Sequence, residues 1–335
     1  MTTRAVHSND VTDAVRPSEP LTPAAPAPGT GRRILRAVAL ISTLPYLAMK
    51  AAWLGGSRIG IPDGSVLLER GPFFTVANAV TLVMDATVIL LVLVLTRPWG
   101  MRVPSWPLIV PAFVATGLLI PIFTAFPGQM AVKALGMGAD EAAQAAQEPF
   151  LDPWVSNVVY IGFMLQGLAL AGLFVPYARE RWGTRWQGVL GKRLPPSTGV
   201  VAGASAVLGL AVTAVQLYWA FGGTAGLSAK QVAVYSAETG VVNAVHAICV
   251  LVAVAGVLLL AGGGQRAARW PLVLAWTGSA AALSWGAWLL IAVLGPDAVG
   301  GQPSTMIHLT YAGQMVTGML GAVVLTRFLA SRRTA

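Results

Sequence analysis

The sequence predicts an all-α membrane protein, a polytopic bundle of eight transmembrane helices. Apolar residues make up 56% of the 335 residues and charged residues only 10%, whereas a typical soluble chain carries about 25% charged residues. Eight apolar stretches reach the length of roughly 20 residues that a helix needs to cross the hydrocarbon core. These stretches are continuously apolar and lack the alternation of barrel strands, so they are expected to be helices.

The predicted spans follow one another along the chain at 37–55, 74–96, 106–126, 155–177, 198–221, 239–261, 270–294 and 305–329. Before them, the run RPSEPLTPAAPAPGTG is too rich in Pro, Ala and Thr to pack a core, which predicts a disordered tail. The first span is expected to be a retained signal anchor. The predicted organisation is a tail (1–34), a four-helix unit (35–180), a basic linker (181–197) and a second four-helix unit (198–330).

Lysines and arginines predict how the chain is oriented. With the amino terminus inside, 17 of the 22 basic residues fall on the inner side. Cytoplasmic loops retain an excess of Lys and Arg, so both termini are predicted to lie in the cytoplasm and the protein in the cell membrane. The bilayer is thus the expected partner, and the net charge of +9 needs no nucleic acid to explain it. Cys249 is the only cysteine, which excludes a disulfide scaffold.

The two halves of the chain share residues at nearly constant spacing. The matches, at offsets of 165, 164 and 151 residues, are Asn78-Ala79-Val80 with Asn243-Ala244-Val245, Trp106-Pro107 with Trp270-Pro271, and Tyr160 and Gly162 with Tyr311 and Gly313. Because the matches keep chain order, they predict an internal duplication. A unit of four spans returns to its starting side, so the two copies are expected to have the same orientation about an axis along the membrane normal.

The repeated unit resembles a known family. The segment 218–227, in which an aromatic helix end runs into Gly222-Gly223, resembles an uncharacterised actinobacterial family of four-helix integral membrane proteins. The resemblance covers residues 37–330 as two divergent copies, and the first copy departs most, with Lys50, Trp53 and Leu54 in place of the aromatic run. The family is a domain of unknown function, so the resemblance implies a fold and no catalytic residue.

Polar side chains within the predicted spans are the candidate ligand-binding residues, because placing a charge at the membrane centre costs about 2.5–3.5 kcal/mol. They are Lys50, Asn78, Asp85, Asn157, Tyr160, Gln216, Asn243, His246, His308 and Tyr311. Most lie in the outer halves of their spans, where they are expected to line a vestibule open to the outside. A second interpretation, in which the Asn and Tyr side chains hydrogen-bond neighbouring helices, stays open.

Asp85 is the most deeply placed of these residues. It lies 11 residues into its span, about 16 Å down at 1.5 Å per residue. Lys50 on the preceding span is its predicted ion-pair partner, although the long lysine side chain could instead extend outward to the membrane surface. A proton-binding role for the pair stays open.

Four residues are candidates for acid/base catalysis: Asp85, Glu238, His246 and His308. Two histidines and a carboxylate form catalytic zinc sites in other proteins. Here these residues lie on different helices and show no metal-binding spacing, so neither a metal nor another cofactor is predicted.

Three functions are compatible with these residues. The first is binding or transport of a small or lipidic ligand through an outward-facing polar cavity, which the position of the polar residues favours. The second is an intramembrane enzyme acting on a prenyl or acyl substrate by acid/base chemistry. The third is a structural subunit of a membrane complex. The oligomeric state is not predicted.

Overall fold

The computed structural model describes residues 29–69, 72–146, 150–294 and 303–332. Within this part of the chain, eight helices are long and apolar enough to cross a membrane, which confirms the predicted all-helical membrane class. They are α1 (Thr30–Leu54), α2 (Pro72–Thr96), α3 (Trp106–Ala134), α5 (Pro153–Trp186), α6 (Pro196–Ala220), α8 (Ala237–Gly262), α9 (Arg269–Leu294) and α10 (Thr305–Ser331). The shorter elements are η1 (Val66–Glu69), η2 (Pro98–Arg102), α4 (Glu141–Ala146), α7 (Ala229–Ala233), β1 (Val189–Gly191) and β2 (Gly264–Ala267).

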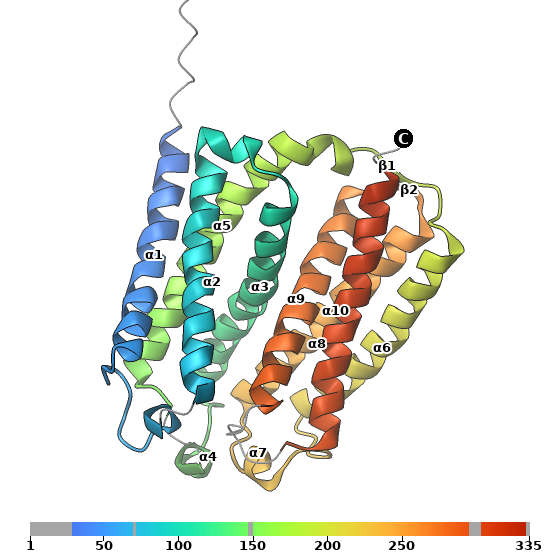
Figure 1. Cartoon of the computed structure of the whole chain (residues 1–335). Coiled ribbons are helices and arrows are strands. Elements are labelled where there is room, and N and C mark those ends of the chain that lie inside the picture. Colours follow the sequence, from blue (N-terminus) through green and yellow to red (C-terminus); the bar gives the residue numbers. More distant parts are fainter. Residues whose placement is uncertain (1–28, 70–71, 147–149, 295–302, 333–335) are drawn as a thin grey trace, which may run out of the picture.

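The long helices form two groups of four that lie side by side (Figure 1). In the first group, α1 packs against α2 and α5, and α3 packs against both α2 and α5. In the second group, α6 packs against α8 and α10, and α9 packs against both α8 and α10. Helix α3 contacts α8 and α9 of the second group, and Phe174 of α5 stacks on Trp276 of α9. Each group is therefore a ring of four helices with its own interior.

The start of α1 and the end of α10 lie at the same end of the molecule. In Figure 1 the start of α1 and the end of α10 both lie at the upper end, here called the terminal end, while α4 and α7 lie at the opposite, loop end. Arginines at the terminal end bind helix carbonyls: Arg32 Nη2 donates to the Leu95 oxygen at 2.6 Å, and Arg181 Nη1 donates to the Gly100 oxygen at 3.2 Å. The last carbonyls of a helix lack intrahelical partners, so Arg32 satisfies one at the end of α2, whereas Arg181 adds to the bonds that the Gly100 oxygen accepts from Val103 N and Tyr177 OH.

Element boundaries differ from the predicted ones at several points. Residues 1–28 of the predicted tail lie outside the described residues, but α1 already begins at Thr30, before the predicted tail ends at residue 34. The bond from Arg32 to the end of α2 explains this earlier start, because it holds the first turn of α1 against the bundle. Helix α5 likewise continues to Trp186, into the predicted linker.

A small antiparallel sheet at the terminal end was not predicted. Strands β1 and β2 pair Val189 with Ala267 and Gly191 with Gly264, which joins the α5–α6 connection to the α8–α9 connection. The guanidinium of Arg332, just after α10, donates to the Gln187 oxygen at 2.9 Å and also to the Val189 oxygen. Such short strands leave no periodic signal in the sequence, because their pairing is between distant segments.

Glycines bring α9 into direct backbone contact with its neighbours. A Cβ atom on Gly278 would lie 2.2 Å from the Ala253 nitrogen of α8, and one on Gly318 of α10 would lie 2.3 Å from the Leu283 nitrogen of α9. Membrane helices associate through close van der Waals packing and not through water exclusion, so small residues at the contacts stabilise the second group.

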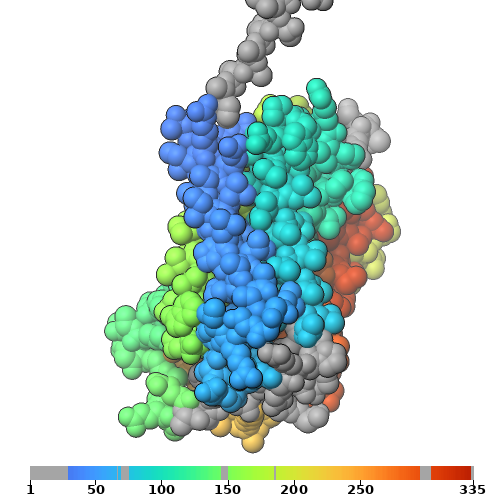
Figure 2. Space-filling model, turned by 60° about the vertical axis from the view of Figure 1, so that its left-hand side comes forward, coloured from blue at the N-terminus to red at the C-terminus, as the bar shows by residue number. Residues whose placement is uncertain are grey.

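Helix α1 lies at the periphery of the first group. Figure 2 shows it on the molecular surface with α2 on one side and α5 on the other, in agreement with its contacts. Only a few of its side chains are fully buried, and one of these is the charged residue Lys50. The apolar residues that α1 leaves exposed, such as Ile41 and Leu44, suit contact with lipid.

Candidate functional site

Lys50 of α1 and Asp85 of α2 form a buried ion pair. Lys50 Nζ donates to Asp85 Oδ2 at 2.6 Å, and the two side chains are only 2% and 11% exposed. This confirms the pair predicted from the sequence, and Lys50 does not extend to the membrane surface. Because an isolated charge in the membrane interior is costly, each side chain offsets part of the free-energy cost of burying the other.

Aromatic side chains complete the surroundings of the Lys50 ammonium. Its Nζ lies 3.9 Å from the centroid of the Tyr46 ring, a geometry in which the ring face attracts a cation. Tyr46 packs edge-on against Phe163 of α5, with the ring centroids 5.4 Å apart. The pair therefore ties together α1, α2 and α5. Tyr46 was not among the residues predicted from the sequence, although its position four residues before Lys50 places both on one helix face.

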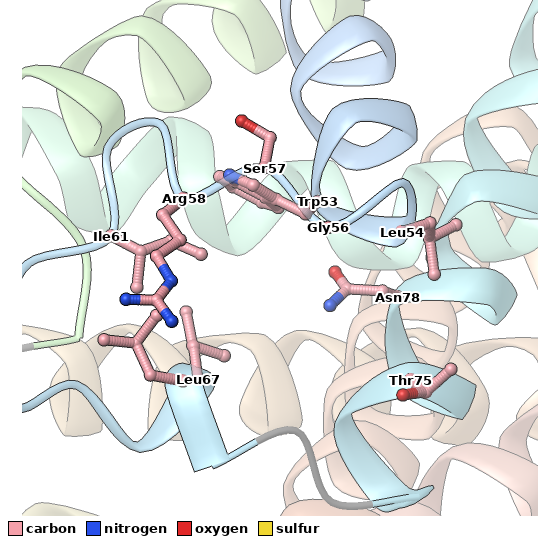
Figure 3. Close-up of a pocket in the computed structure, with 10 residues that line it drawn as sticks. Trp53, Leu54, Gly56, Ser57, Arg58, Ile61, Leu67, Thr75 and Asn78 are labelled. Carbon is pink, nitrogen blue, oxygen red and sulfur yellow. The ribbon is translucent and has the colours of Figure 1, made fainter.

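A pocket of about 120 Å³ lies at the loop end of the first group (Figure 3). It is formed by the end of α1, the connection that follows α1, and the start of α2. Its lining residues are Trp53, Leu54, Gly56, Ser57, Arg58, Ile61, Leu67, Leu68, Thr75 and Asn78. Among the ligand-binding residues predicted from the sequence, Asn78 lines this pocket.

The connection after α1 folds back because of a glycine turn. Gly56 adopts a φ of 96°, and the Ser57 nitrogen donates to the Ala52 oxygen at 2.9 Å, an arrangement typical of helix ends that terminate in a left-handed residue. Trp53 Nε1 donates to the Ile59 oxygen at 2.8 Å and holds the following residues beside the helix end. Figure 3 shows the Arg58 guanidinium and the Asn78 amide on opposite sides of the space that results.

The pocket and the buried ion pair lie along the same part of the first group. Asn78 and Asp85 are seven residues apart on α2, so they share a helix face and are separated by about 10 Å along its axis. On α1, Lys50 lies one turn before Leu54, which lines the pocket. The ion pair thus lies deeper in the bundle than the pocket, beneath the residues that form its wall.

The second group contains an uncharged polar network. Gln314 Nε2 of α10 lies 3.1 Å from His246 Nδ1 of α8, and Gln216 Nε2 of α6 donates to Gln314 Oε1 at 3.3 Å. All three side chains are buried, and the Trp285 ring packs edge-on against His246. Hydrogen bonds to Gln314 thus connect Gln216 and His246, two of the residues predicted from the sequence. Gln314 itself was not predicted, although it follows Tyr311 by one helical turn.

Glu238 and His308 have partners of their own. Glu238 Oε2 pairs with Lys133 Nζ at 3.0 Å and lies in a wider groove of about 580 Å³ at the loop end, with Asp140 and Gln144. His308 Nδ1 lies 2.9 Å from the Ser304 oxygen at the start of its own helix. In the described part of the chain, no hydrogen bond or ion pair joins any two of the four candidate acid/base residues.

The remaining predicted residues lie nearer the surface or between helices. Asn157 is exposed, whereas Asn243 and Tyr311 are half-buried. Tyr160 is 39% exposed and stacks on Phe126, with the ring centroids 5.1 Å apart. Of these four residues, none lines the pocket in Figure 3.

The chemistry available to the protein therefore differs between the two groups. The first combines a pocket carrying an arginine and an amide with a buried ion pair, and the second holds a neutral amide–imidazole network. Among the described residues, no group of three or more His, Cys, Asp or Glu side chains is arranged to hold a metal ion. Comparison of the chain with protein-family models, with curated proteins and with solved structures finds no match.

Proposed function

We propose that this integral membrane protein binds or transports a small or lipidic ligand, and that the pocket in Figure 3 is where the ligand is first held. The observation that carries the proposal is the position of Asn78, a polar side chain within a membrane span whose amide faces a pocket. The same face of α2 leads to the Lys50–Asp85 pair. Buried ionisable groups in membrane proteins commonly mark ligand or ion pathways.

The orientation proposed from the sequence places this pocket outside the cell. The basic side chains Arg32, Arg97 and Arg181 belong to the terminal end, and an excess of such residues favours the cytoplasm. The loop end then faces outward. Because Cys249 is the only cysteine and is buried, single cysteines at exposed positions can report the orientation.

An impermeant maleimide added to intact cells tests this orientation. We expect it to label Asp63→Cys at the loop end and to leave Arg102→Cys at the terminal end unlabelled until the cells are opened. The reverse pattern would place the pocket on the cytoplasmic side.

The proposed duplication is supported by the helix contacts. The order of neighbours around the first ring, α1–α2–α3–α5, corresponds to α6–α8–α9–α10 around the second. Two copies of one unit would be expected to repeat their neighbours in this way, and the resemblance to a four-helix actinobacterial family is consistent with such a unit. The two copies would then share one orientation in the membrane.

Ligand binding is tested by native mass spectrometry of protein purified gently from its own membranes. We expect a non-covalent adduct on the unmodified protein and a clear loss of that adduct in Asn78→Leu. Thr87→Val is the matched control, because Thr87 is half-buried on the same helix, does not line the pocket, and bonds only the Val83 oxygen in the described structure. An adduct retained equally in both variants would remove this pocket from the proposal.

The two alternative functions have less support. An enzyme using Asp85, Glu238, His246 and His308 needs them to reach one substrate within about 3 Å, whereas each has a separate partner in the described structure. A structural subunit of a larger complex would purify without an adduct that depends on Asn78.

A further inference from the structure

We infer that the pocket in Figure 3 recognises the phosphate group of an anionic ligand. The inference rests on the proposed function and specifies the ligand by its chemistry. Three observations lead to it: the charge of the pocket lining, the hydrogen-bond donors available there, and the size of the pocket and its position at the ends of two candidate membrane spans.

The described lining carries a positive charge and no negative one. Arg58 is the charged residue among the lining residues, and its guanidinium has no hydrogen-bond or ion-pair partner within the described residues. The nearest charged residue on the same face of α2, Asp85, is neutralised by Lys50. An anion entering the pocket therefore meets an unpaired guanidinium, whose planar donors match the oxygens of a phosphate.

Neutral donors lie beside the same space. The Asn78 amide lies across the pocket from Arg58 in Figure 3, and Thr75, whose side chain carries a hydroxyl group, also lines the pocket. The Ser57 hydroxyl group is turned away from this space in Figure 3 and accepts a hydrogen bond from the Ile59 nitrogen at 3.3 Å. One guanidinium, one amide and one hydroxyl group suit a group with several acceptor oxygens.

The size and position of the pocket suit a head group. Its volume of about 120 Å³ is well below the roughly 300–1,000 Å³ of pockets that enclose whole drug-sized ligands. It lies where α1 ends and α2 begins, and Trp53 in its wall is a residue typical of the membrane interface. Lipid phosphates lie at that level, and phosphorylated solutes reach it from water.

The test compares Arg58→Gln with the unmodified protein in a neutral detergent. Phosphatidylglycerol in mixed micelles and soluble glycerol phosphate are the two probes, and diacylglycerol is the probe that lacks phosphate. Arg102→Gln is the matched control, because it removes an exposed arginine at the terminal end. Bound probe is counted by native mass spectrometry, and thermal unfolding confirms that each variant is folded.

We expect Arg58→Gln to weaken phosphatidylglycerol binding about tenfold or more, as the loss of a charge-assisted bond predicts. Arg102→Gln should bind as the unmodified protein does, and Arg58→Lys should retain part of the affinity. If glycerol phosphate shows the same dependence on Arg58, the site accepts soluble phosphates as well. If only phosphatidylglycerol does, the site is specific for a lipid head group.

Equal binding of phosphatidylglycerol and diacylglycerol, or equal binding by Arg58→Gln and the unmodified protein, would overturn the inference. The proposed function can be judged separately. If the adduct from native membranes still depends on Asn78, the pocket binds a ligand of another class. If it does not, both the inference and the proposed function are wrong.

Discussion

The helices of the two groups pack against their neighbours through different kinds of contact. In the second group, glycines place helix backbones in contact, and 39% of the most apolar 18 residues of its first helix, α6, are buried. For α1, the first helix of the other group, the buried share is 17%, and its charged and aromatic side chains contact α2 and α5. The first helix of the second group is thus packed more closely than the first helix of the first group, whose end forms part of the pocket wall.

The polar side chains inside the two groups also differ. Lys50 on the first helix of one group and Gln216 on the first helix of the other lie near corresponding positions of the proposed repeat. Lys50 has a charged partner, and Gln216 bonds a neutral amide. Asn78 lines a pocket, whereas its counterpart Asn243 is half-buried and lines neither of the two pockets described above. If the halves are copies, the features suited to ligand binding are concentrated in the first.

The largest effect is expected from breaking the buried ion pair. Asp85→Leu leaves the Lys50 ammonium buried without its carboxylate, which should lower the free energy of unfolding by about 3–5 kcal/mol. The double variant Lys50→Met with Asp85→Leu should recover most of this loss, because neither charge then remains. Unfolding in a denaturing-detergent titration measures both.

The pair Lys133–Glu238 is the control for this prediction. Lys133 is 53% exposed, so Lys133→Met should cost only about 0–1 kcal/mol. If Asp85→Leu and Lys133→Met lowered the free energy of unfolding by similar amounts, burial would not make the Lys50–Asp85 pair more important for stability than the exposed pair.

A smaller effect is expected from disturbing the glycine contacts. Gly278→Ala would force its Cβ against the Ala253 backbone of α8, and overpacking of this kind costs about 1–3 kcal/mol. Gly203→Ala on α6 is the matched change, since a Cβ there meets no atom within 4 Å. It should leave stability unchanged or raise it slightly, because alanine favours the helix. Equal effects at the two positions would mean that the backbone contact at Gly278 does not stabilise the second group.

The smallest effect is expected from the uncharged hydrogen bonds. Gln314→Leu removes the link between Gln216 and His246, for which two lost bonds predict about 1 kcal/mol at an average of ~0.6 kcal/mol each. Gln166→Leu in the first group removes a single bond to Thr43 and should cost about half as much. The same unfolding titration measures the free energy of unfolding of both variants. A larger decrease for Gln166→Leu than for Gln314→Leu would contradict this prediction.

The sequence by itself predicted the membrane class and the eight spans, and it named Lys50 and Asp85 as ion-pair partners while leaving open a lysine that extends outward. These follow from local quantities: the length of each apolar stretch, the rise per residue of a helix, and the cost of an unpaired charge in lipid. Helix ends were less predictable. The start of α1 and the end of α5 differ from the predicted bounds, and the start of α1 depends on a bond to a distant segment, from Arg32 to Leu95.

Only the tertiary structure decided which polar residues meet. The rotation of each helix about its axis places Gln314 between Gln216 and His246 and keeps Glu238 and His308 apart from them, because helix packing depends on the shapes of all neighbouring side chains. The pocket also needed the fold. Arg58 comes to face Asn78 only because the turn at Gly56 directs the chain back over the end of α1, and side chains in two different segments acquire a common function only where the backbone brings them together.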